Sequence, residues 1–391
     1  MKQVLTGSST VALAAKLSRV QVISAYPITP QTGIVETLSE FVANGELDAE
    51  FMKVESEHSA MSACIGAAAT GTRTFTATSS QGLALMSEML FVASGLRLPI
   101  VMAVANRSYS APLSIWNDWQ DSISMRDSGW IQIYCENNQE ILDSIIQGYR
   151  IAEEAFLPVM VCLDGYILTH SAEPVNVMEQ AEVDAFLPPY KFPYPLDPKE
   201  PVTIGAVGVP EYYQEFRRAL QEVIVGSKKK IIEIDKDFGE RFGRSYGLFE
   251  CYRSEDADIL LLTMGSLSGT VKKVIDHCRD QGESVGLIRL RAFRPFPADE
   301  LVDVLREAKV VAVLEKDISL GFAGALYLET SAAFTNAKER PLLIDFICGL
   351  GGRDISTHQI GEAIKVAERA ATTGKVEEPV RWLGMREEFM R

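Results

Sequence analysis

The chain has 391 residues, of which 47% are hydrophobic and 23% are charged, as in an ordinary globular protein. Its 53 Asp and Glu outnumber its 38 Lys and Arg, and the resulting formal charge of −15 argues against a nucleic-acid or anionic-membrane surface. The amino terminus lacks a signal-peptide pattern, and no uncharged apolar run approaches membrane-spanning length, so we expect a cytoplasmic protein.

The cysteines carry no metal-binding pattern. All six are widely scattered, and none forms a C-x-x-C pair. This spacing predicts buried thiols in a reducing cytoplasm, and it disfavours ligands of zinc or of an iron–sulfur cluster. If redox chemistry occurs here, its metal centres lie in another chain. The cysteines are Cys64, Cys135, Cys162, Cys251, Cys278 and Cys348.

The first 175 residues alternate between strand and helix signals at short spacing. Such repeated strand–helix units predict a parallel sheet with helices on both faces. A long irregular segment is expected at 107–127. The predicted strands are 20–24, 51–55, 72–78, 99–105, 130–135 and 158–163, and the predicted helices are 8–17, 33–43, 57–70, 82–94 and 138–154.

Residues 173–205 break this pattern because prolines cluster there, which predicts a connecting arm or a surface strap outside the core. Residues 206–247 are charged and mostly helical in pattern, most clearly at 211–225. The sequence Gly-Ser-Lys-Lys-Lys at 226–230 lacks the first glycine and the preceding strand of a phosphate loop, and we interpret it as a solvated turn.

A second α/β domain is predicted to begin near Asp256, which divides the chain into domains at 1–245 and 255–391. A rigid turn at 294–297 and a tight glycine loop at 349–354 interrupt this domain, and we expect the glycine loop to be structural. Thr357 is expected to cap the last helix. The predicted strands are 259–263, 285–290, 310–314 and 342–347, and the predicted helices are 264–281, 298–308, 321–334 and 357–371.

Segment 26–32 (YPITPQT) connects the first predicted strand to a helix, and its two prolines exclude it from both. It therefore lies at the carboxyl edge of the sheet, where open parallel sheets bind ligands, with the Thr29 hydroxyl on a stiff frame. Segments 55–59, 78–82 and 106–110 follow other strands and share that edge. Glu57 lies in the first turn of its helix, where a carboxylate is favoured, and Arg107 could clamp a carboxylate. Taken singly, these residues have plainer roles in a helix start and an exposed loop.

Several stretches together resemble the alpha subunits of the multi-subunit pyruvate:ferredoxin oxidoreductases (pyruvate synthases), within the 2-oxoacid:ferredoxin oxidoreductase family. The resemblance covers essentially the whole chain in order, and the joint occurrence of the motifs is highly specific. The matching stretches are 25–30 (AYPITP), 55–60 (ESEHSA), 76–82 (TATSSQG), 106–107 (NR), 115–118 (IWND), 126–130 (RDSGW), 290–297 (LRAFRPFP) and 349–352 (GLGG).

The resemblance implies an α/β fold, with a thiamine-diphosphate-binding (pyrimidine-type) parallel-sheet domain followed by a transketolase C-terminal-like α/β domain. It assigns to Glu57 the cofactor-activating role of hydrogen-bonding the aminopyrimidine ring, with Glu55 as a neighbouring candidate. It assigns the substrate, a 2-oxoacid, to Thr29 and Arg107. Further contacts with the cofactor are expected from Pro27, Ile28, Ser80 and Gln81.

The same resemblance assigns the remaining parts of the enzyme to other chains. No convincing motif for magnesium and diphosphate is present, and Leu163-Asp164-Gly165 is interpreted as a strand end. Mg²⁺ and the iron–sulfur clusters are therefore expected in beta, gamma and delta partner subunits, with no metal in this chain. The implied reaction is the reversible oxidative decarboxylation of pyruvate to acetyl-CoA and CO₂, with coenzyme A as co-substrate and electrons passed to ferredoxin. The active site would form only in the hetero-oligomer.

Two kinds of alternative stay open at this point. The same chemistry on 2-oxoglutarate, 2-oxoisovalerate or oxalate would share this architecture. The pair of Thr29 and Arg107 suits a small acid such as pyruvate, whereas oxalate would call for an extra cation near the neutral Thr29. An alternative from a different class is a non-catalytic scaffold subunit with a relic pocket. The presence of Thr29, Glu57 and Arg107 argues against that alternative.

Overall fold

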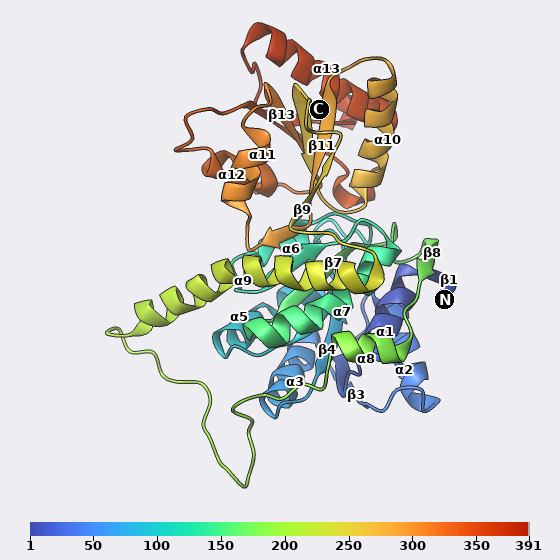
Figure 1. Cartoon of the computed structure of the whole chain (residues 1–391), viewed down its shortest axis with the longest axis vertical. Helices are drawn as coiled ribbons and strands as arrows, with labels where there is room; N and C mark the ends of the chain where they lie inside the picture. The colour runs from blue at the N-terminus through green and yellow to red at the C-terminus, as the bar shows by residue number, and fades with distance from the viewer. Residues whose placement is uncertain (390–391) are drawn as a thin grey trace.

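The computed structural model describes residues 1–389, which form two large sheets that follow one another along the long axis of the molecule (Figure 1). The first sheet has seven strands in the order β12-β6-β7-β5-β4-β2-β3, and every pairing in it is parallel except that of β12 with β6. Its strands are β2 (Val22–Ala25), β3 (Glu50–Lys53), β4 (Thr74–Thr78), β5 (Val101–Asn106), β6 (Ile131–Tyr134), β7 (Val159–Asp164) and β12 (Ala292–Arg294).

Helices cover both faces of this sheet, as the repeated strand–helix units predict. Apolar residues of α1 and α7 pack on one face, and those of α3 and α5 pack on the other. The second apolar cluster continues into the carboxy-terminal part of the chain, where it includes Leu262 and Phe293. The helices of this region are α1 (Gly7–Leu17), α2 (Thr32–Ala43), α3 (Glu57–Ala69), α4 (Ser80–Leu85), α5 (Ser87–Gly95), α6 (Gln120–Ser124) and α7 (Asn138–Ala155).

The second sheet has six strands in the order β15-β14-β13-β10-β11-β9, and only β9 is antiparallel to its neighbour. The α/β fold class is therefore confirmed. The strands are β9 (Phe249–Tyr252), β10 (Ile259–Thr263), β11 (Val285–Leu290), β13 (Val310–Glu315), β14 (Leu342–Ile347) and β15 (Val380–Trp382). The helices are α10 (Leu267–Asp280), α11 (Ala298–Leu305), α12 (Ala325–Ala333) and α13 (Thr357–Thr373), with 3₁₀ turns at Leu350–Gly352 and Glu387–Phe389.

The chain crosses between the two sheets more than once. β9 lies before residue 255 but joins the second sheet, whereas β12 follows β11 in sequence and joins the first sheet. The division at 245 to 255 stays a prediction. No helix among residues 1–389 is long and apolar enough to cross a membrane.

The expectation for residues 226–230 is wrong, because this stretch lies inside α9 (Tyr213–Phe242), a continuous helix of 30 residues. Ser227 is buried, and Lys228 forms an ion pair of 3.0 Å with Glu300 of α11. Buried Leu220, Ile231, Ile234 and Phe238 continue at helical spacing on both sides of the glycine. Packing of that face offsets the cost of about 1 kcal/mol that a glycine brings to a helix interior.

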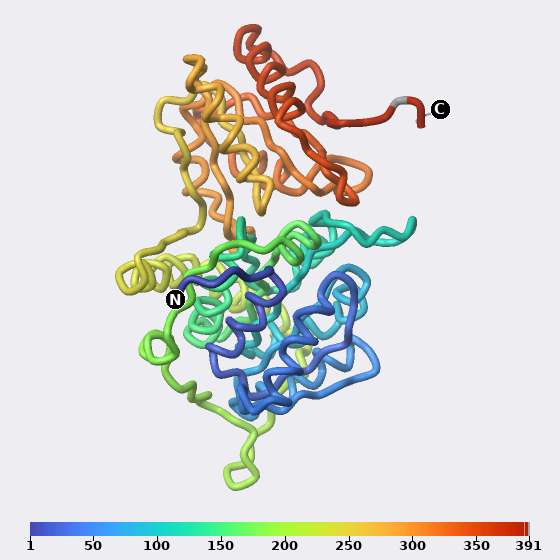
Figure 2. The backbone as a smooth tube through the Cα atoms, turned by 90° about the vertical axis from the view of Figure 1, so that its right-hand side faces the viewer, coloured from blue at the N-terminus to red at the C-terminus, as the bar shows by residue number. Residues whose placement is uncertain are grey.

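The proline-rich segment is only partly a strap. Its first part forms β8 (Ala172–Asn176), which pairs antiparallel with β1 (Lys2–Thr6), and α8 (Gln180–Phe186). Phe186 is in the main apolar core, with its ring centroid 5.2 Å from that of Phe238, so the prediction that 173–205 lies outside the core is wrong there. From 188 onward the segment is mostly exposed and runs around the outside of the molecule before α9 begins (Figures 1 and 2).

Four smaller expectations also differ from the structure. The helix predicted at 82–94 is two helices, α4 and α5, which meet at Met86. The helix predicted from 321 begins at Ala325. Ser356, and not Thr357, caps α13, because its hydroxyl accepts from the Gln359 backbone in a capping box. Among the six cysteines, Cys251 is exposed and the other five are buried.

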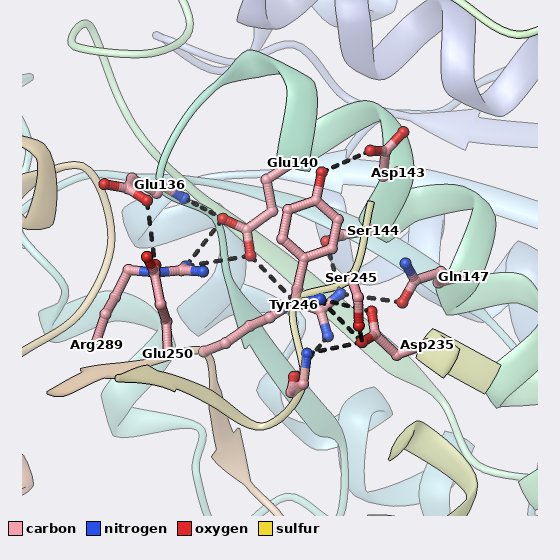
Figure 3. Close-up of polar contacts among 12 residues, drawn as sticks. Glu136, Glu140, Asp143, Ser144, Gln147, Asp235, Ser245, Tyr246, Glu250 and Arg289 are labelled. Carbon is pink, nitrogen blue, oxygen red and sulfur yellow. Dashed lines mark hydrogen bonds and ion pairs between the residues drawn. The ribbon is translucent and has the colours of Figure 1, made fainter. Parts of the chain in front are cut away.

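The segment that connects α9 to the second sheet is bound to α7 by a polar network (Figure 3). The Asp235 carboxylate accepts from the backbone N–H of Tyr246 at 2.9 Å, and Asp143 accepts from the Tyr246 hydroxyl at 2.6 Å. Glu140 of α7 forms an ion pair of 2.9 Å with Arg289 of β11. Both ion-pair partners are buried, and the pair joins α7 beside the first sheet to β11 of the second sheet.

Candidate active site

The predicted site segments meet at one edge of the first sheet. Asn106 of β5 lies opposite Asp164 of β7, so these two strands end at the same level, and Thr78 ends β4 opposite Val104, two residues earlier. Direct contacts join the loops that follow them. Arg107 Nη1 donates to the carbonyl of Thr29 at 3.0 Å, which links the loops after β5 and β2.

The turn after β2 is anchored to β4 on its buried side and is exposed on its other side. Gln31 is fully buried, and its Nε2 donates to the carbonyl of Ala77 in β4 at 2.6 Å. The Gln31 Oε1 accepts from the backbone N–H of Ile28 at 3.2 Å. Pro27 and Thr29 are exposed, and no described residue forms a hydrogen bond with the Thr29 hydroxyl. The turn therefore presents Thr29 on a frame that a buried amide holds in place.

Glu57 is buried at the start of α3, where Ser56 supplies the helix cap and accepts from the Ser59 backbone at 3.3 Å. The residue is only 6% exposed, yet no hydrogen bond or ion pair joins its carboxylate to another residue within 1–389. Burial raises the pKa of Glu57. Glu55 is exposed, and a hydrogen bond from the Ser59 hydroxyl lowers its pKa. Of the two candidate carboxylates, Glu57 is the more buried and the only one whose pKa is raised, which favours the sharing of a proton.

Glu57 lies against the beginning of α4. A Cβ atom at Gly82 would be 2.5 Å from Glu57 Oε1 and 2.5 Å from Thr78 Oγ1, so only glycine fits between them. The Thr78 hydroxyl and the Nε2 of Gln81 are buried and have no hydrogen-bond partner in the described part of the chain. These groups fit the aminopyrimidine ring of thiamine diphosphate, because such a ring offers both donors and acceptors.

Arg107 is a buried cation whose guanidinium forms no ion pair in the described part of the chain, although the charge of Asp121 acts on it from nearby. It is 6% exposed, and no described carboxylate lies within ion-pair distance of its guanidinium. Its Nε donates to the carbonyl of Ser114 at 2.9 Å, and burial lowers its pKa. Carbonyl groups orient the guanidinium but do not neutralise it. The arrangement is therefore suited to an anionic ligand with a carboxylate.

Asp164 links this edge to the second sheet. It is the last residue of β7, as its sequence context predicts. Its carboxylate accepts from Trp119 Nε1 at 2.8 Å and from Lys316 Nζ at 3.0 Å. Burial alone would raise the pKa of Asp164, but the charge of Lys316 and the hydrogen bonds outweigh this effect and lower it. No spacing in the sequence indicates this pair, because its members are far apart along the chain.

The glycine loop after β14 packs against the loop 114–119, and its amides are already occupied. The Gly352 N–H donates to the carbonyl of Asn117 at 2.6 Å, and the Gly351 N–H donates to the Asp118 carboxylate at 3.2 Å. Both glycines have a positive φ, 61° and 75°, and a Cβ at Gly352 would collide with Trp116. The structural role expected for this loop agrees with these contacts.

Buried carboxyl groups around the junction of the two sheets make the stability of the chain depend on pH. Burial raises the pKa of Asp118 to about 7, and it raises those of Asp317 and Asp345 to about 6. The pKa of Asp in an unfolded chain is about 3.9. The folded chain therefore binds more protons than the unfolded chain above that pH, and this stability is lost as the pH rises through 6 to 7.

Urea unfolding of the purified chain is accordingly expected to give a free energy of unfolding on the order of 5 kcal/mol lower at pH 8 than at pH 5. Groups with a lowered pKa, such as Asp164, change the free energy of unfolding only at a pH below this range of 5 to 8. The control is Asp317→Asn, which removes one of the three groups and should reduce the dependence on pH. A chain that becomes more stable from pH 5 to pH 8 would contradict this account.

Comparison with known proteins identifies the family to which the fold belongs. Residues 13–236 match the family described as pyruvate flavodoxin/ferredoxin oxidoreductase, thiamine diphosphate-binding, and residues 257–360 match pyruvate:ferredoxin oxidoreductase core domain II. A solved structure of 2-oxoglutarate:ferredoxin oxidoreductase from Magnetococcus marinus has a TM-score of 0.74 at 20% identity, and the match covers 93% of this chain and 65% of that chain. The fold is therefore that of a thiamine-diphosphate-dependent oxidoreductase.

Curated relatives give the family more narrowly. The chain is 56% identical to pyruvate synthase subunit PorA of Methanocaldococcus jannaschii over 392 residues, 98% of each chain. It is 47% identical to ketoisovalerate oxidoreductase subunit VorA of Pyrococcus horikoshii over 384 residues, again 98% of each chain. The chain belongs to the pyruvate:ferredoxin oxidoreductase family.

Proposed function

We propose that this chain is the alpha subunit of a pyruvate:ferredoxin oxidoreductase and contributes the pyrimidine half of a thiamine diphosphate site. The observation that carries the proposal is a pair of buried, opposite charges at one sheet edge. Neither Glu57 nor Arg107 forms an ion pair with any residue in 1–389. An unpaired buried charge is costly, so each is best explained by a ligand that completes it.

Glu57 is the residue that holds and moves a proton. Burial raises the pKa of Glu57, and a carboxyl group with a raised pKa is better suited to share a proton with a ring nitrogen. The geometry supports a ring in the space bounded by Glu57, Thr78 and Gly82. When bound, thiamine diphosphate supplies a carbon centre that can accept the negative charge left by decarboxylation. Pro27, Ile28, Ser80 and Gln81 border the same edge and are assigned to the cofactor.

Arg107 and Thr29 are assigned to the substrate. The guanidinium would pair with the carboxylate of a 2-oxoacid, and the exposed Thr29 hydroxyl would donate to it from the neighbouring turn. Pyruvate is favoured among such acids because identity is higher to the pyruvate synthase subunit, at 56%, than to the ketoisovalerate oxidoreductase subunit, at 47%. The absence of a charge on Thr29 disfavours oxalate, which carries a second carboxylate.

The proposal assigns the other parts of the enzyme to partner chains. Beta, gamma and delta subunits would hold Mg²⁺, the diphosphate end of the cofactor and the iron–sulfur clusters, and ferredoxin would take the electrons. Coenzyme A would enter as co-substrate. The relatives are named as subunits, which supports a hetero-oligomer. The six free cysteines support a location in the reducing cytoplasm.

The test is a comparison of substrates with the assembled complex. Reduction of a low-potential acceptor is measured with coenzyme A and thiamine diphosphate, and with pyruvate, 2-oxoglutarate, 2-oxoisovalerate or oxalate. A clear preference for pyruvate is the expected result. Preference for another acid would keep the mechanism and change the substrate. No activity with any acid, in a complex shown to hold cofactor and clusters, would contradict the proposal and favour a scaffold subunit.

A further inference from the structure

A single carboxylate lies between the two halves of the candidate site. Asp121 of α6 is fully buried, and its Oδ2 accepts from the backbone N–H of Ser80 at 2.9 Å and from that of Arg107 at 3.0 Å. Its Oδ1 accepts from Asn106 Nδ2 at 2.8 Å and from the backbone N–H of Ser122 at 2.8 Å. No cation among residues 1–389 forms an ion pair with it.

We propose that Asp121 is a positioning residue that holds the cofactor segment at Ser80 and the substrate residue Arg107 in a fixed mutual geometry. This inference rests on the proposed function, which assigns Ser80 to the cofactor and Arg107 to the 2-oxoacid. Asp121 is fully buried and receives its hydrogen bonds from protein groups, so we assign it no direct contact with either ligand. It acts through the two backbone amides that share its Oδ2 atom.

Ser80 needs such a constraint because its backbone is in the left-handed region, with φ of 47°. A residue other than glycine adopts that conformation only when its surroundings compensate for the strain. Here the N–H of Ser80 bonds to Asp121, and its hydroxyl donates to the carbonyl of Ser108 at 2.6 Å. Release of the Asp121 contact would let the turn relax and shift Gly82, which lies directly against the Glu57 carboxylate.

Asp121 constrains the backbone of Arg107, from which the guanidinium extends into the site. It is the first residue after β5, and its guanidinium is aimed by the carbonyls of Thr29 and Ser114. Both of those carbonyls belong to loops. The bond from the Arg107 N–H to Asp121 fixes the starting point of the side chain, because the Asp121 carboxylate is also bonded to Asn106 at the end of β5.

The donor set explains why this position suits an aspartate. An ionised carboxylate is an acceptor only, and Asp121 receives four N–H groups, two on each oxygen. Asparagine has the same shape but offers one acceptor oxygen, and its NH₂ group would face two donors. Asn106 can relieve part of this conflict, because its Oδ1 is buried without a partner in the described part of the chain and could accept from the new amide. Asp121→Asn is therefore expected to fold.

The experiment compares Asp121→Asn with Asp143→Asn in the assembled complex. Asp143 is the matched control, because it is equally buried and accepts from Arg244 and Tyr246 at the connection to the second sheet. The dissociation constant for thiamine diphosphate, the KM for pyruvate and the urea unfolding midpoint are measured for each. Asp121→Asn should raise both the dissociation constant and KM by roughly tenfold to a hundredfold, whereas Asp143→Asn should lower only the unfolding midpoint.

A second comparison separates the two arms of the proposal. The double variant Arg107→Ala, Asp121→Asn should have the same KM for pyruvate as Arg107→Ala alone. It should still bind thiamine diphosphate more weakly than Arg107→Ala alone. Wild-type values of both constants in Asp121→Asn would overturn the proposal, as would changes equal to those of Asp143→Asn. Failure of the proposed function gives a different result, in which Arg107→Ala alone leaves KM unchanged.

Discussion

Glu57→Gln in the assembled complex is expected to lower turnover with pyruvate by roughly a hundredfold to ten-thousandfold, the contribution typical of a positioned proton-transfer group. The Glu57 carboxyl is buried, its pKa is raised, and it has no protein partner within residues 1–389. Glutamine keeps the volume and a hydrogen bond but cannot exchange a proton. The measurement is pyruvate-dependent reduction of a low-potential acceptor, with subunit association followed by gel filtration.

The neighbouring Glu55→Gln is the control for this prediction. Glu55 lies two residues earlier on the exposed side of the α3 start, and its carboxylate accepts from Ser59. Its substitution should leave turnover close to that of the unmodified complex. Near-normal turnover in Glu57→Gln, with the subunits assembled, would refute the role of Glu57. Loss of turnover in both variants would show that the effect arises from the helix start and not from the buried carboxyl group.

Arg107→Ala is expected to weaken the use of pyruvate by about 2–5 kcal/mol in kcat/KM, the effect of removing one member of a buried, hydrogen-bonded charge pair. The effect should lie mainly in KM, because the guanidinium holds the carboxylate and takes no part in proton transfer. The saturation curve for pyruvate at fixed coenzyme A is the measurement. A curve that is unchanged would remove Arg107 from the site.

Arg97→Ala is the matched control, because Arg97 lies in the turn that precedes β5 whereas Arg107 follows β5. Arg97 also lacks a carboxylate partner within 1–389, and burial lowers its pKa as well. Its Nε and Nη2 donate to the carbonyls of Phe156 and Ala155, at 2.7 and 2.8 Å, at the end of α7. Its removal should destabilise the fold but leave KM for pyruvate unchanged. A KM effect equal to that of Arg107→Ala would point to a general loosening of β5.

The central strands of the first sheet could be predicted because β5 and β7 are nearly continuous apolar runs. Residues of β5 and β7 are buried on both faces, and that pattern is typical of a parallel sheet. The positions of Thr29, Glu57 and Arg107 follow from the same logic, because the carboxyl ends of parallel strands share an edge. The structure brings these three residues to that edge, with Arg107 in contact with the backbone of Thr29.

Other features depend on contacts between residues distant in sequence, and no local pattern indicates them. β12 has three residues and exists because it pairs with β6, more than a hundred residues earlier in the chain. α9 has a charged sequence with an internal glycine, and its packing on α7 decides its length. Asp121 and Asp164 have no motif of their own, since each gains its partners only when separate loops meet.

The central claim is that this chain supplies one half of a cofactor site, and binding of thiamine diphosphate tests it most directly. Calorimetric titration in the presence of Mg²⁺ would compare the purified chain, the partner subunits and the assembled complex. We expect stoichiometric binding and pyruvate-dependent turnover only in the complex, with no iron in the purified chain. Stoichiometric binding of thiamine diphosphate by the purified chain, together with turnover of pyruvate, would contradict the account.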